Sequence, residues 1–165
     1  MLRIARTTDP SGDYRLVPDD NLEEFVMGTC DLVFSGFTSD NTPAVAKARI
    51  FRDLQKLLKQ NGVVISLVSS PEIYLHQWAS FTTKDFPENA AARSGDAVRI
   101  IVTDHQDRRP VEDILCTNES YQGSIEQRAC KPFGQSSRSQ KDEPYPWVNE
   151  TEIAPWVIYV LKRAT

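Results

Sequence analysis

Two apolar runs on either side of an amphipathic segment constrain the fold of this chain more than any other feature. Residues 31–37 contain consecutive apolar side chains, and residues 63–68 form a second continuous apolar run. Such runs are typical of strands buried on both faces of a sheet. Between them, apolar residues recur at helical spacing. The order strand, helix, strand with short connections predicts a βαβ unit with two parallel, neighbouring strands.

The helix of this unit is predicted to begin near Pro43 and to run for about five turns. Thr42 is its expected N-cap, Pro43 suits the first helical position, and Gly62 is expected to end the helix in a left-handed conformation. Lys47 is placed on the polar face with most of the other charged residues. The apolar face is formed by Ala46, Ile50, Phe51, Leu54, Leu57 and Leu58.

Further elements are predicted on both sides of the βαβ unit. In chain order they are a two-turn helix at 1–8, a strand at 13–17, a hairpin formed by 97–103 and 111–115, a helix capped by Thr117 that carries Tyr121, Ile125 and Ala129, and a strand at 155–161. Residues 69–96 form a polar and aromatic segment that is too long for an ordinary connection. We therefore expect this segment to be functional or partly helical.

Size and charge narrow the classes of function. A chain of 165 residues fits one domain, 1–165, with a substantial core. The net charge of -4, without a basic stripe, makes nucleic acid and membranes unexpected partners. No long apolar run or signal peptide is found, which predicts a soluble, cytoplasmic protein. Cys30, Cys116 and Cys130 lack the spacing of a disulfide framework or a zinc site, so we expect reduced thiols and no metal.

Polar residues follow the first buried strand at a position where α/β sheets bind ligands. Ser35, Thr38, Asp40 and Asn41 lie at or just after the end of this strand. In open α/β sheets, ligands bind outside the carboxyl ends of the strands. We therefore expect these residues at a ligand crevice.

Four segments of the sequence resemble the class I S-adenosylmethionine-dependent methyltransferases, of the type 11/12-like group. They are DYRLVPDDNLEEF, CDLVFSGFTSDNTP, LLKQNGVVISLVSS and APWVIYVLKR. The stretch LLKQNGVVI is similar to the family's LLKPGG entry to its fifth strand, although Gln60 and Asn61 stand where the family often has Pro and Gly. The resemblance covers nearly the whole chain. It implies a Rossmann-like α/β sheet with a β-hairpin and a lid insertion at 69–96.

The family's glycine-rich cofactor motif is missing from this sequence. The family binds the methionine and ribose of its cofactor through a glycine-rich turn and an acidic residue that ends the next strand, and neither is found here. The resemblance therefore implies a sheet that is incomplete at the N-terminus, without the family's first and second strands. Without those two strands, the predicted strand at 31–37 would form an open, apolar edge of the sheet. Either the chain is a fragment, or a second chain, such as another copy, completes the sheet.

The function implied by the resemblance is methyl transfer from S-adenosylmethionine to a small-molecule acceptor. The resemblance places the adenine contact on Asp20, Asn21 or Leu22, and it places Ser35 and Phe37 beneath the methionine end of the cofactor. It places Asp40 near the transferred methyl group, where its carboxylate could act as a base. Two simpler interpretations stay open: a solvated acidic loop around Asp20, and a purely capping role for Asp40.

The aromatic part of 69–96 contains candidates for contact with the acceptor. The imidazole of His76 could act as a base, while Tyr74 and Trp78 could form an apolar or cation-binding wall. The alternative is ordinary packing, because a lone histidine among aromatic residues is more often a hydrogen-bonded structural residue than a catalyst.

Two other functions remain compatible with the sequence. The chain could be a non-catalytic remnant or interaction module that pairs with another chain through its exposed strand edge. It could also bind a different nucleotide, because a doubly wound sheet does not determine function. The acceptor atom is left open by all of these patterns.

Overall fold

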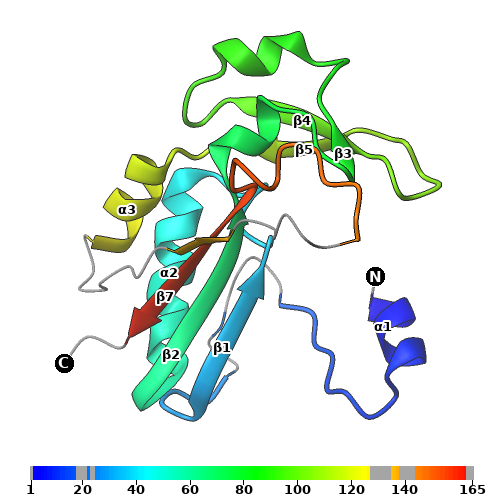
Figure 1. The fold of residues 1–165 in the computed structure, drawn as a ribbon. Coiled ribbons are helices and arrows are strands. Elements are labelled where there is room, and N and C mark those ends of the chain that lie inside the picture. Colours follow the sequence, from blue (N-terminus) through cyan, green and yellow to red (C-terminus); the bar gives the residue numbers. More distant parts are fainter. Residues whose placement is uncertain (1, 18–21, 23–24, 127–134, 138–143, 163–165) are drawn as a thin grey trace.

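The computed structural model describes residues 2–17, 22, 25–126, 135–137 and 144–162 (Figure 1). The elements in chain order are α1 (Leu2–Thr8), β1 (Cys30–Gly36), α2 (Ala44–Leu57), β2 (Leu58–Ser69), η2 (Pro71–Tyr74), β3 (Phe81–Thr82), η3 (Pro87–Ala91), β4 (Ala97–Val102), β5 (Val111–Ile114), α3 (Asn118–Glu126), β6 (Gln135–Ser137) and β7 (Trp156–Lys162). The two η elements are short 3-10 helices. No described helix is both long enough and apolar enough to cross a membrane.

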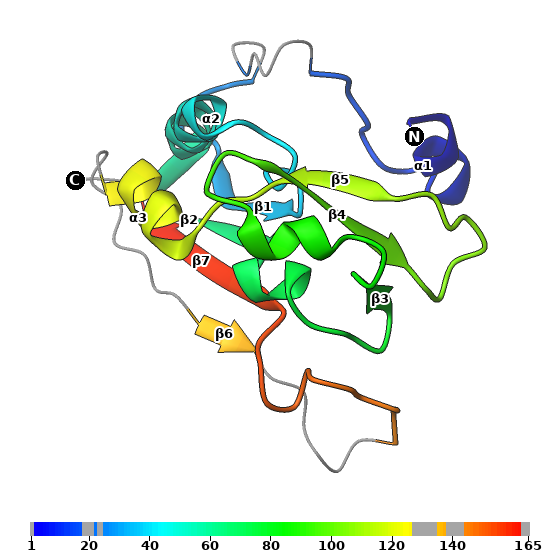
Figure 2. The same cartoon turned by 90° about the horizontal axis from the view of Figure 1, so that it is seen from above.

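The main sheet has the strand order β1-β2-β7-β6. β1 and β2 are parallel, and β7 is antiparallel to both β2 and β6. The predicted βαβ unit is therefore confirmed, because α2 connects two parallel neighbours. Helices α2 and α3 both contribute to the core on one face of this sheet (Figure 2).

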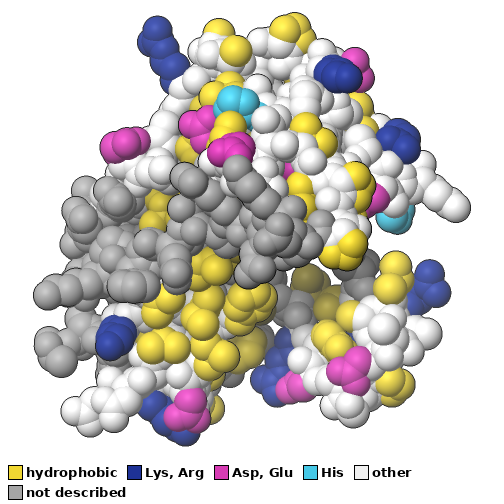
Figure 3. Space-filling model, in the orientation of Figure 1, with side chains coloured by type: hydrophobic (Ala, Val, Ile, Leu, Met, Phe, Trp, Pro, Cys, Tyr) yellow, Lys and Arg dark blue, Asp and Glu magenta, His cyan; other side chains and the backbone are white. Residues whose placement is uncertain are grey.

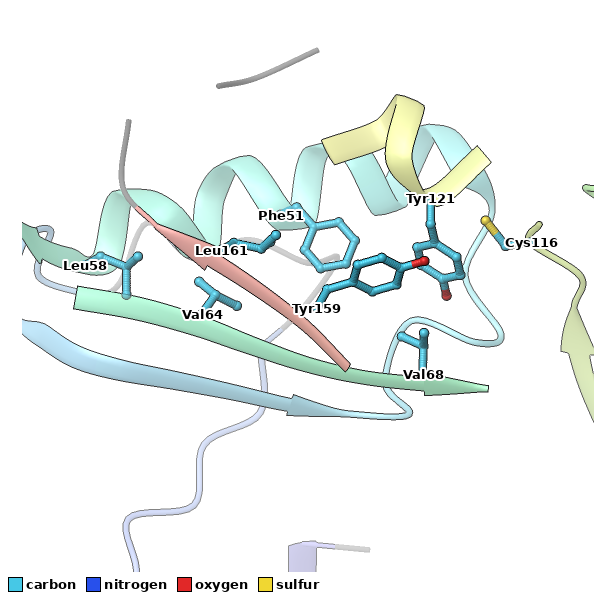
Figure 4. Packing of buried hydrophobic residues seen from close by; sticks show 8 residues of the cluster. All are labelled: Phe51, Leu58, Val64, Val68, Cys116, Tyr121, Tyr159 and Leu161. Atoms are coloured by element: carbon cyan, nitrogen blue, oxygen red, sulfur yellow. The ribbon is translucent and has the colours of Figure 1, made fainter. Parts of the chain in front are cut away.

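The main core lies between this sheet and the two helices (Figure 4). Alternate residues of β2 point toward the helices, so that Val64 and Val68 are almost completely buried. Phe51 of α2 and Tyr121 of α3 cover them from the other side. Burial of each large apolar side chain stabilises the fold by about 1.5 to 3 kcal/mol. This packing holds β1 and β2 in fixed positions beside each other.

A smaller antiparallel sheet, β3-β4-β5, lies beyond the carboxyl ends of β1 and β2 (Figure 1). The predicted hairpin of β4 and β5 is confirmed. A second core joins this sheet to residues of 69–96, and its buried members are Ile73, Tyr74, Trp78, Val98, Ile100 and Leu115. The long polar and aromatic segment is thus structured by packing on β4.

Asn89 connects the segment 69–96 to β4 through its side-chain amide. Its Nδ2 donates to the carbonyl oxygens of Arg99 (2.8 Å) and Tyr74 (3.3 Å), and its Oδ1 accepts from the Arg99 N–H (3.1 Å). Because Asn89 is only 4% exposed, these bonds replace contacts with water.

The predicted strand at 13–17 is wrong, because the structure has no regular element there. An extended segment needs a neighbouring strand to pair its backbone groups, and none of the described strands lies beside it. Tyr14 instead donates a hydrogen bond from its hydroxyl to Asp9 (3.0 Å). Local turn contacts thus replace a strand ladder.

The helix α2 ends at Leu57, earlier than predicted, and β2 begins at the next residue. Leu58 is completely buried in the strand, so tertiary packing overrides its helical spacing. Gly62 does not have a positive φ. A Cβ atom there would lie 2.7 Å from the carbonyl oxygen of Cys30, so close approach to β1 requires the glycine. The N-cap position of α2 is occupied by Pro43 instead of Thr42.

β1 lies at one edge of the main sheet, as the resemblance implied. The prediction from its apolar run, a strand buried on both faces, is wrong, because no residue of β1 is fully buried. Leu32 is 54% exposed and Phe34 is 65% exposed. Hydrophobic side chains gather over the strands on the sheet face turned toward the viewer in Figure 3. An exposed apolar edge of this kind favours association with other chains.

Candidate functional site

A cavity of about 330 Å³ lies where the carboxyl ends of β1 and β2 meet the smaller sheet. We call it the central cavity. Its polar lining residues are Asp40, Asn41, Ser69 and Asp113. Its apolar lining includes Phe37, Ile73, Phe81, Ile100 and Trp156. The cavity thus combines a largely apolar wall with two carboxylates, a composition typical of small-molecule sites.

Phe37 turns the chain from β1 into the loop that borders the cavity. Its N–H donates to the carbonyl of Leu67 (2.8 Å), which extends the pairing of β1 with β2. Its φ of 55° lies in the left-handed region, at a cost of about 1 to 2 kcal/mol for a residue with a Cβ. The ring packs edge-on against Trp156, with centroids 6.4 Å apart. The strained turn therefore sets an aromatic side chain at the cavity wall.

Asp40 connects three elements around the cavity. Its Oδ2 accepts from the N–H (3.1 Å) and the hydroxyl (2.8 Å) of Ser69, and its Oδ1 accepts from the Tyr121 hydroxyl (3.3 Å). Burial raises the pKa of this carboxyl, and the charge of Asp113 raises it further, although the bonds from Ser69 oppose both effects. Asp40 is therefore held rigidly and binds protons more readily than an exposed aspartate.

Asp113 is the second carboxylate of the central cavity and comes from β5. Its side chain is buried, and its Oδ2 accepts from the hydroxyl of Tyr74 (3.0 Å). Within the described residues, its other oxygen has no hydrogen bond. Burial raises the pKa of Asp113, while the bond from Tyr74 and the charge of Lys47 lower it. Asp113 thus presents an oxygen that is free to bind a ligand.

Lys47 is buried near both carboxylates, although the sequence placed it on the polar face of its helix. It is only 1% exposed, because α3 packs against α2 and covers it. Its Nζ lies 4.7 Å from the centroid of the Tyr121 ring and makes no hydrogen bond to an oxygen of the described residues. Burial lowers the pKa of Lys47, and nearby Cys116 and Asp40 oppose this shift.

The charges of this cluster do not balance when all three groups are ionised. Two carboxylates, Asp40 and Asp113, share one ammonium, that of Lys47. Burial raises the pKa of the Tyr74 and Tyr121 hydroxyls well above the ordinary value, so both remain neutral hydrogen-bond donors. The surplus negative charge can be balanced by a proton or by a cationic ligand.

Solved structures share this arrangement of elements. A S-adenosylmethionine-dependent methyltransferase from Mesorhizobium loti matches with a TM-score of 0.65 and 17% identity, over 99% of this chain and 76% of that protein. One from Bacteroides fragilis, in complex with S-adenosyl-L-homocysteine, matches with a TM-score of 0.56 and 13% identity, over 99% of this chain and 59% of that protein. The chain has a methyltransferase-like α/β fold.

A protein from Pyrococcus horikoshii also matches, with a TM-score of 0.56 and 10% identity, over 98% of this chain. The chain spans 64% of the length of that protein, less than two thirds. No family model matches the sequence, and no curated protein matches it. The likeness to known proteins is therefore one of fold.

The structure brings some of the predicted site residues together at the central cavity. Phe37 and Asp40 line it, and Tyr74 reaches it through the hydrogen bond to Asp113. Ser35 instead lines a separate cavity of about 240 Å³ that also contacts α2 residues such as Ile50. The predicted contacts of Phe37 and Asp40 with the cofactor stay predictions.

His76 and Trp78 lie away from the lining of the central cavity. His76 pairs with Glu72 (2.9 Å) on the surface of the segment 69–96. Trp78 is buried in the second core and donates from its indole N–H to the carbonyl of Ile73 (2.8 Å). Asp20 and Asn21 lie outside the described residues. Their roles stay predictions.

Two residues that the sequence analysis did not select are central to the site. Asp113 stands between Val111 and Leu115 at an inward position of its strand, and a charged residue in such an alternation signals a buried site. Lys47 precedes Phe51 by one helical turn and therefore lies on the apolar stripe of α2. The position of Asp113 within an alternating strand and the position of Lys47 one helical turn before Phe51 can both be read from the sequence.

Proposed function

We propose that this chain forms the acceptor side of a S-adenosylmethionine-dependent methyltransferase that acts on a small molecule. The observation that supports the proposal is the position of the central cavity. It lies at the carboxyl ends of β1 and β2, where open α/β sheets bind ligands, in a fold shared with such methyltransferases. Asp40 and Asp113 supply the polar groups that a transfer site needs.

The residues at the end of β1 fit the charged end of the proposed cofactor. An aromatic ring and a carboxylate both favour a positive charge, and Phe37 and Asp40 provide them at the cavity wall. When bound, S-adenosylmethionine supplies a methyl group activated by a sulfonium. We propose further contacts from Ser35, Asp20 and Asn21, as implied by the resemblance.

The chain's own contribution to the reaction is positioning, proton binding and exclusion of water. The apolar wall orients the acceptor, and effective alignment of two reactants can supply several kcal/mol of catalysis. Asp40 or Asp113 can take a proton from an acceptor, because the raised pKa of each brings it closer to neutral pH. Ile73 and Phe81 bring the segment 69–96 to the cavity, and we propose that this segment covers the acceptor.

The proposal is tested by calorimetric titration of the purified chain with S-adenosylhomocysteine, with sedimentation in parallel. We expect binding in the micromolar range, about -8 kcal/mol. Folded protein that binds no S-adenosylhomocysteine would contradict a catalytic role for this chain. In that case methyl transfer would require groups that the chain does not provide.

A second function is favoured by the exposed edge of β1. Phe34 and Leu32 present apolar side chains on a strand that no other described strand pairs with on its outer side, which is the arrangement used in strand addition. A non-catalytic interaction module would therefore bind another chain at this edge. Sedimentation and the titration together distinguish the two functions, because a module of this kind associates without binding S-adenosylhomocysteine.

A further inference from the structure

We propose that the central cavity binds a small apolar molecule that carries a protonated amine. The assignment of this amine as the methyl acceptor rests on the proposed function. The recognition of an apolar cation follows from the cavity itself and can be tested without any cofactor.

The charge of the cavity selects for a cation. Both of its charged lining residues, Asp40 and Asp113, are acidic, whereas Lys47 is not part of the lining. A ligand in the cavity therefore meets the surplus negative charge directly, without an intervening basic side chain among the described residues. Transfer of an unpaired carboxylate from water into a protein interior is unfavourable, and a bound ammonium offsets this cost.

The two carboxylates differ in their capacity to bind this ammonium. Asp40 already accepts three hydrogen bonds, from Ser69 and Tyr121. Asp113 accepts one, from Tyr74, and its second oxygen has no partner within the described residues. Asp113 is also only 8% exposed. The geometry therefore assigns the direct contact with the ligand to Asp113.

The walls of the cavity select for an apolar body of limited size. Phe37 and Trp156 form an edge-on aromatic pair, and Ile73, Phe81 and Ile100 complete the apolar surface. The volume of about 330 Å³ lies at the lower end of the range for small-molecule sites, about 300 to 1,000 Å³. A single ring with a short aminoalkyl chain fits these limits. The aromatic pair adds attraction for the ammonium.

A protonated amine must lose a proton before it can be methylated, and a carboxylate with a raised pKa is a suitable acceptor for that proton. An ammonium has no lone pair and cannot accept a methyl group until it loses a proton. Transfer of this proton to Asp113 gives a neutral amine and a neutral carboxylic acid, with the number of protons and the total charge unchanged. Burial of Asp113 favours its neutral form and so makes this transfer less unfavourable than transfer to an exposed aspartate.

The test is calorimetric titration of the full chain with three probes that share one phenyl ring. They are 2-phenylethylamine, 2-phenylethanol and 3-phenylpropanoate, which are respectively cationic, neutral and anionic at pH 7. We expect the amine to bind at least about tenfold more tightly than the alcohol, because a hydrogen bond between two charged groups is stronger than one to a neutral hydroxyl. The anion should not bind.

Variants locate the bound amine. Asp113→Asn keeps the shape of the side chain but removes its charge, and we expect about a tenfold or greater loss of affinity for the amine. Glu112→Gln is the matched control, because Glu112 is the exposed neighbour of Asp113 on the same strand. Its affinity for the amine should be unchanged. Circular dichroism of each variant reports whether it folds.

Several results would overturn the inference. Equal binding of amine and alcohol would mean that the charge of the ligand plays no part. This comparison uses the unaltered chain, so it remains possible if Asp113→Asn fails to fold. Binding of S-adenosylhomocysteine without any amine binding would reject the inference and leave the proposed function intact. Competition between the amine and S-adenosylhomocysteine would assign the carboxylates to the cofactor site and would also overturn the inference.

Amine binding without S-adenosylhomocysteine binding would support the inference, because the cavity would bind the proposed class of ligand. The same result would contradict the proposed function.

Discussion

The carboxylate of Asp40 binds both the backbone N–H (3.1 Å) and the hydroxyl (2.8 Å) of Ser69. Asp40 follows β1, and Ser69 is the last residue of β2, the parallel neighbour of β1. Their contact therefore fixes the position of the loop after β1 relative to the end of β2. The carbonyl of Asp40 also accepts from the N–H of Ile114 (2.8 Å), which ties the same point to the smaller sheet. Asp40 is therefore a structural connection between the two sheets as well as a candidate site residue.

Replacement of Asp40 by alanine is expected to destabilise the fold. The variant leaves the N–H of Ser69 without its buried acceptor, which costs about 1 to 3 kcal/mol. Urea unfolding measures the loss. Asp31→Ala is the control, because Asp31 forms an exposed pair with Lys59 and such pairs contribute about 0 to 1 kcal/mol. Equal losses in both variants would contradict a structural role for Asp40.

The contribution of Asp40 and Asp113 to stability is expected to fall as the pH rises above the ordinary aspartate pKa of 3.8. Burial raises the pKa of Asp40 and of Asp113, so between 3.8 and the raised values the folded state binds more protons than the unfolded state. Their contribution to the free energy of unfolding therefore declines with pH in this window. Urea unfolding from pH 4 to 7 measures the slope, and Asp113→Asn should reduce it. An unchanged slope in this variant would exclude Asp113 as a contributor.

Lys47→Met is expected to raise the pKa values of both cavity carboxyls further. The ammonium of Lys47 lowers the pKa of Asp40 and of Asp113, and methionine removes this charge while it retains an unbranched side chain. Carbon-detected NMR titration of the aspartate carboxyls measures the shift. Lys59→Met, on the protein surface, should leave both values unchanged. If Lys47→Met also leaves them unchanged, the ammonium does not act on these groups.

Asn89→Ala is expected to loosen the smaller sheet. The variant removes three hydrogen bonds to the backbone of Tyr74 and Arg99, with an expected loss of about 1 to 3 kcal/mol. Amide hydrogen exchange should accelerate in β4 and remain slow in the centre of β2. The neighbouring Ala90→Ser provides the control, since Ala90 is exposed. Uniform acceleration in both sheets would show that they unfold as one unit.

Phe34→Lys is expected to prevent any association through the β1 edge. A charged side chain on an edge strand disfavours pairing with another chain, and Phe34 is already 65% exposed, so the stability of the monomer should change by less than about 0.5 kcal/mol. Sedimentation measures the oligomeric state. Val45→Lys, at an 87% exposed position in α2, is the control. Association that persists in Phe34→Lys would place the interface elsewhere.

The central βαβ unit and the hairpin could be predicted because their signals are local. Apolar runs and helical spacing within 31–68 determine which segments are strands and which is the helix, and the short connections determine that β1 and β2 are parallel. The same reasoning placed Asp40 just after the end of the first predicted strand, where it lines the central cavity. These features depend on neighbours in the sequence.

The boundary between α2 and β2 could not be predicted in the same way. Leu57 and Leu58 continue the helical spacing, yet Leu58 pairs with Cys30 and is buried in the sheet. Gly62 carries a typical signal for a helix end but is required by the close approach of Cys30. Both outcomes depend on β1, a partner more than twenty residues away in the chain.

The sequence by itself determined the order of the central elements and the polar cluster that ends β1. Only the tertiary structure decided that Asp113 and Lys47 meet Asp40 beside one cavity, because these residues come from β5, α2 and the loop after β1. Burial and charge at this site arise from packing between distant segments. Local spacing can mark such residues as inward-facing, but only the assembled sheets and helices determine which groups they face.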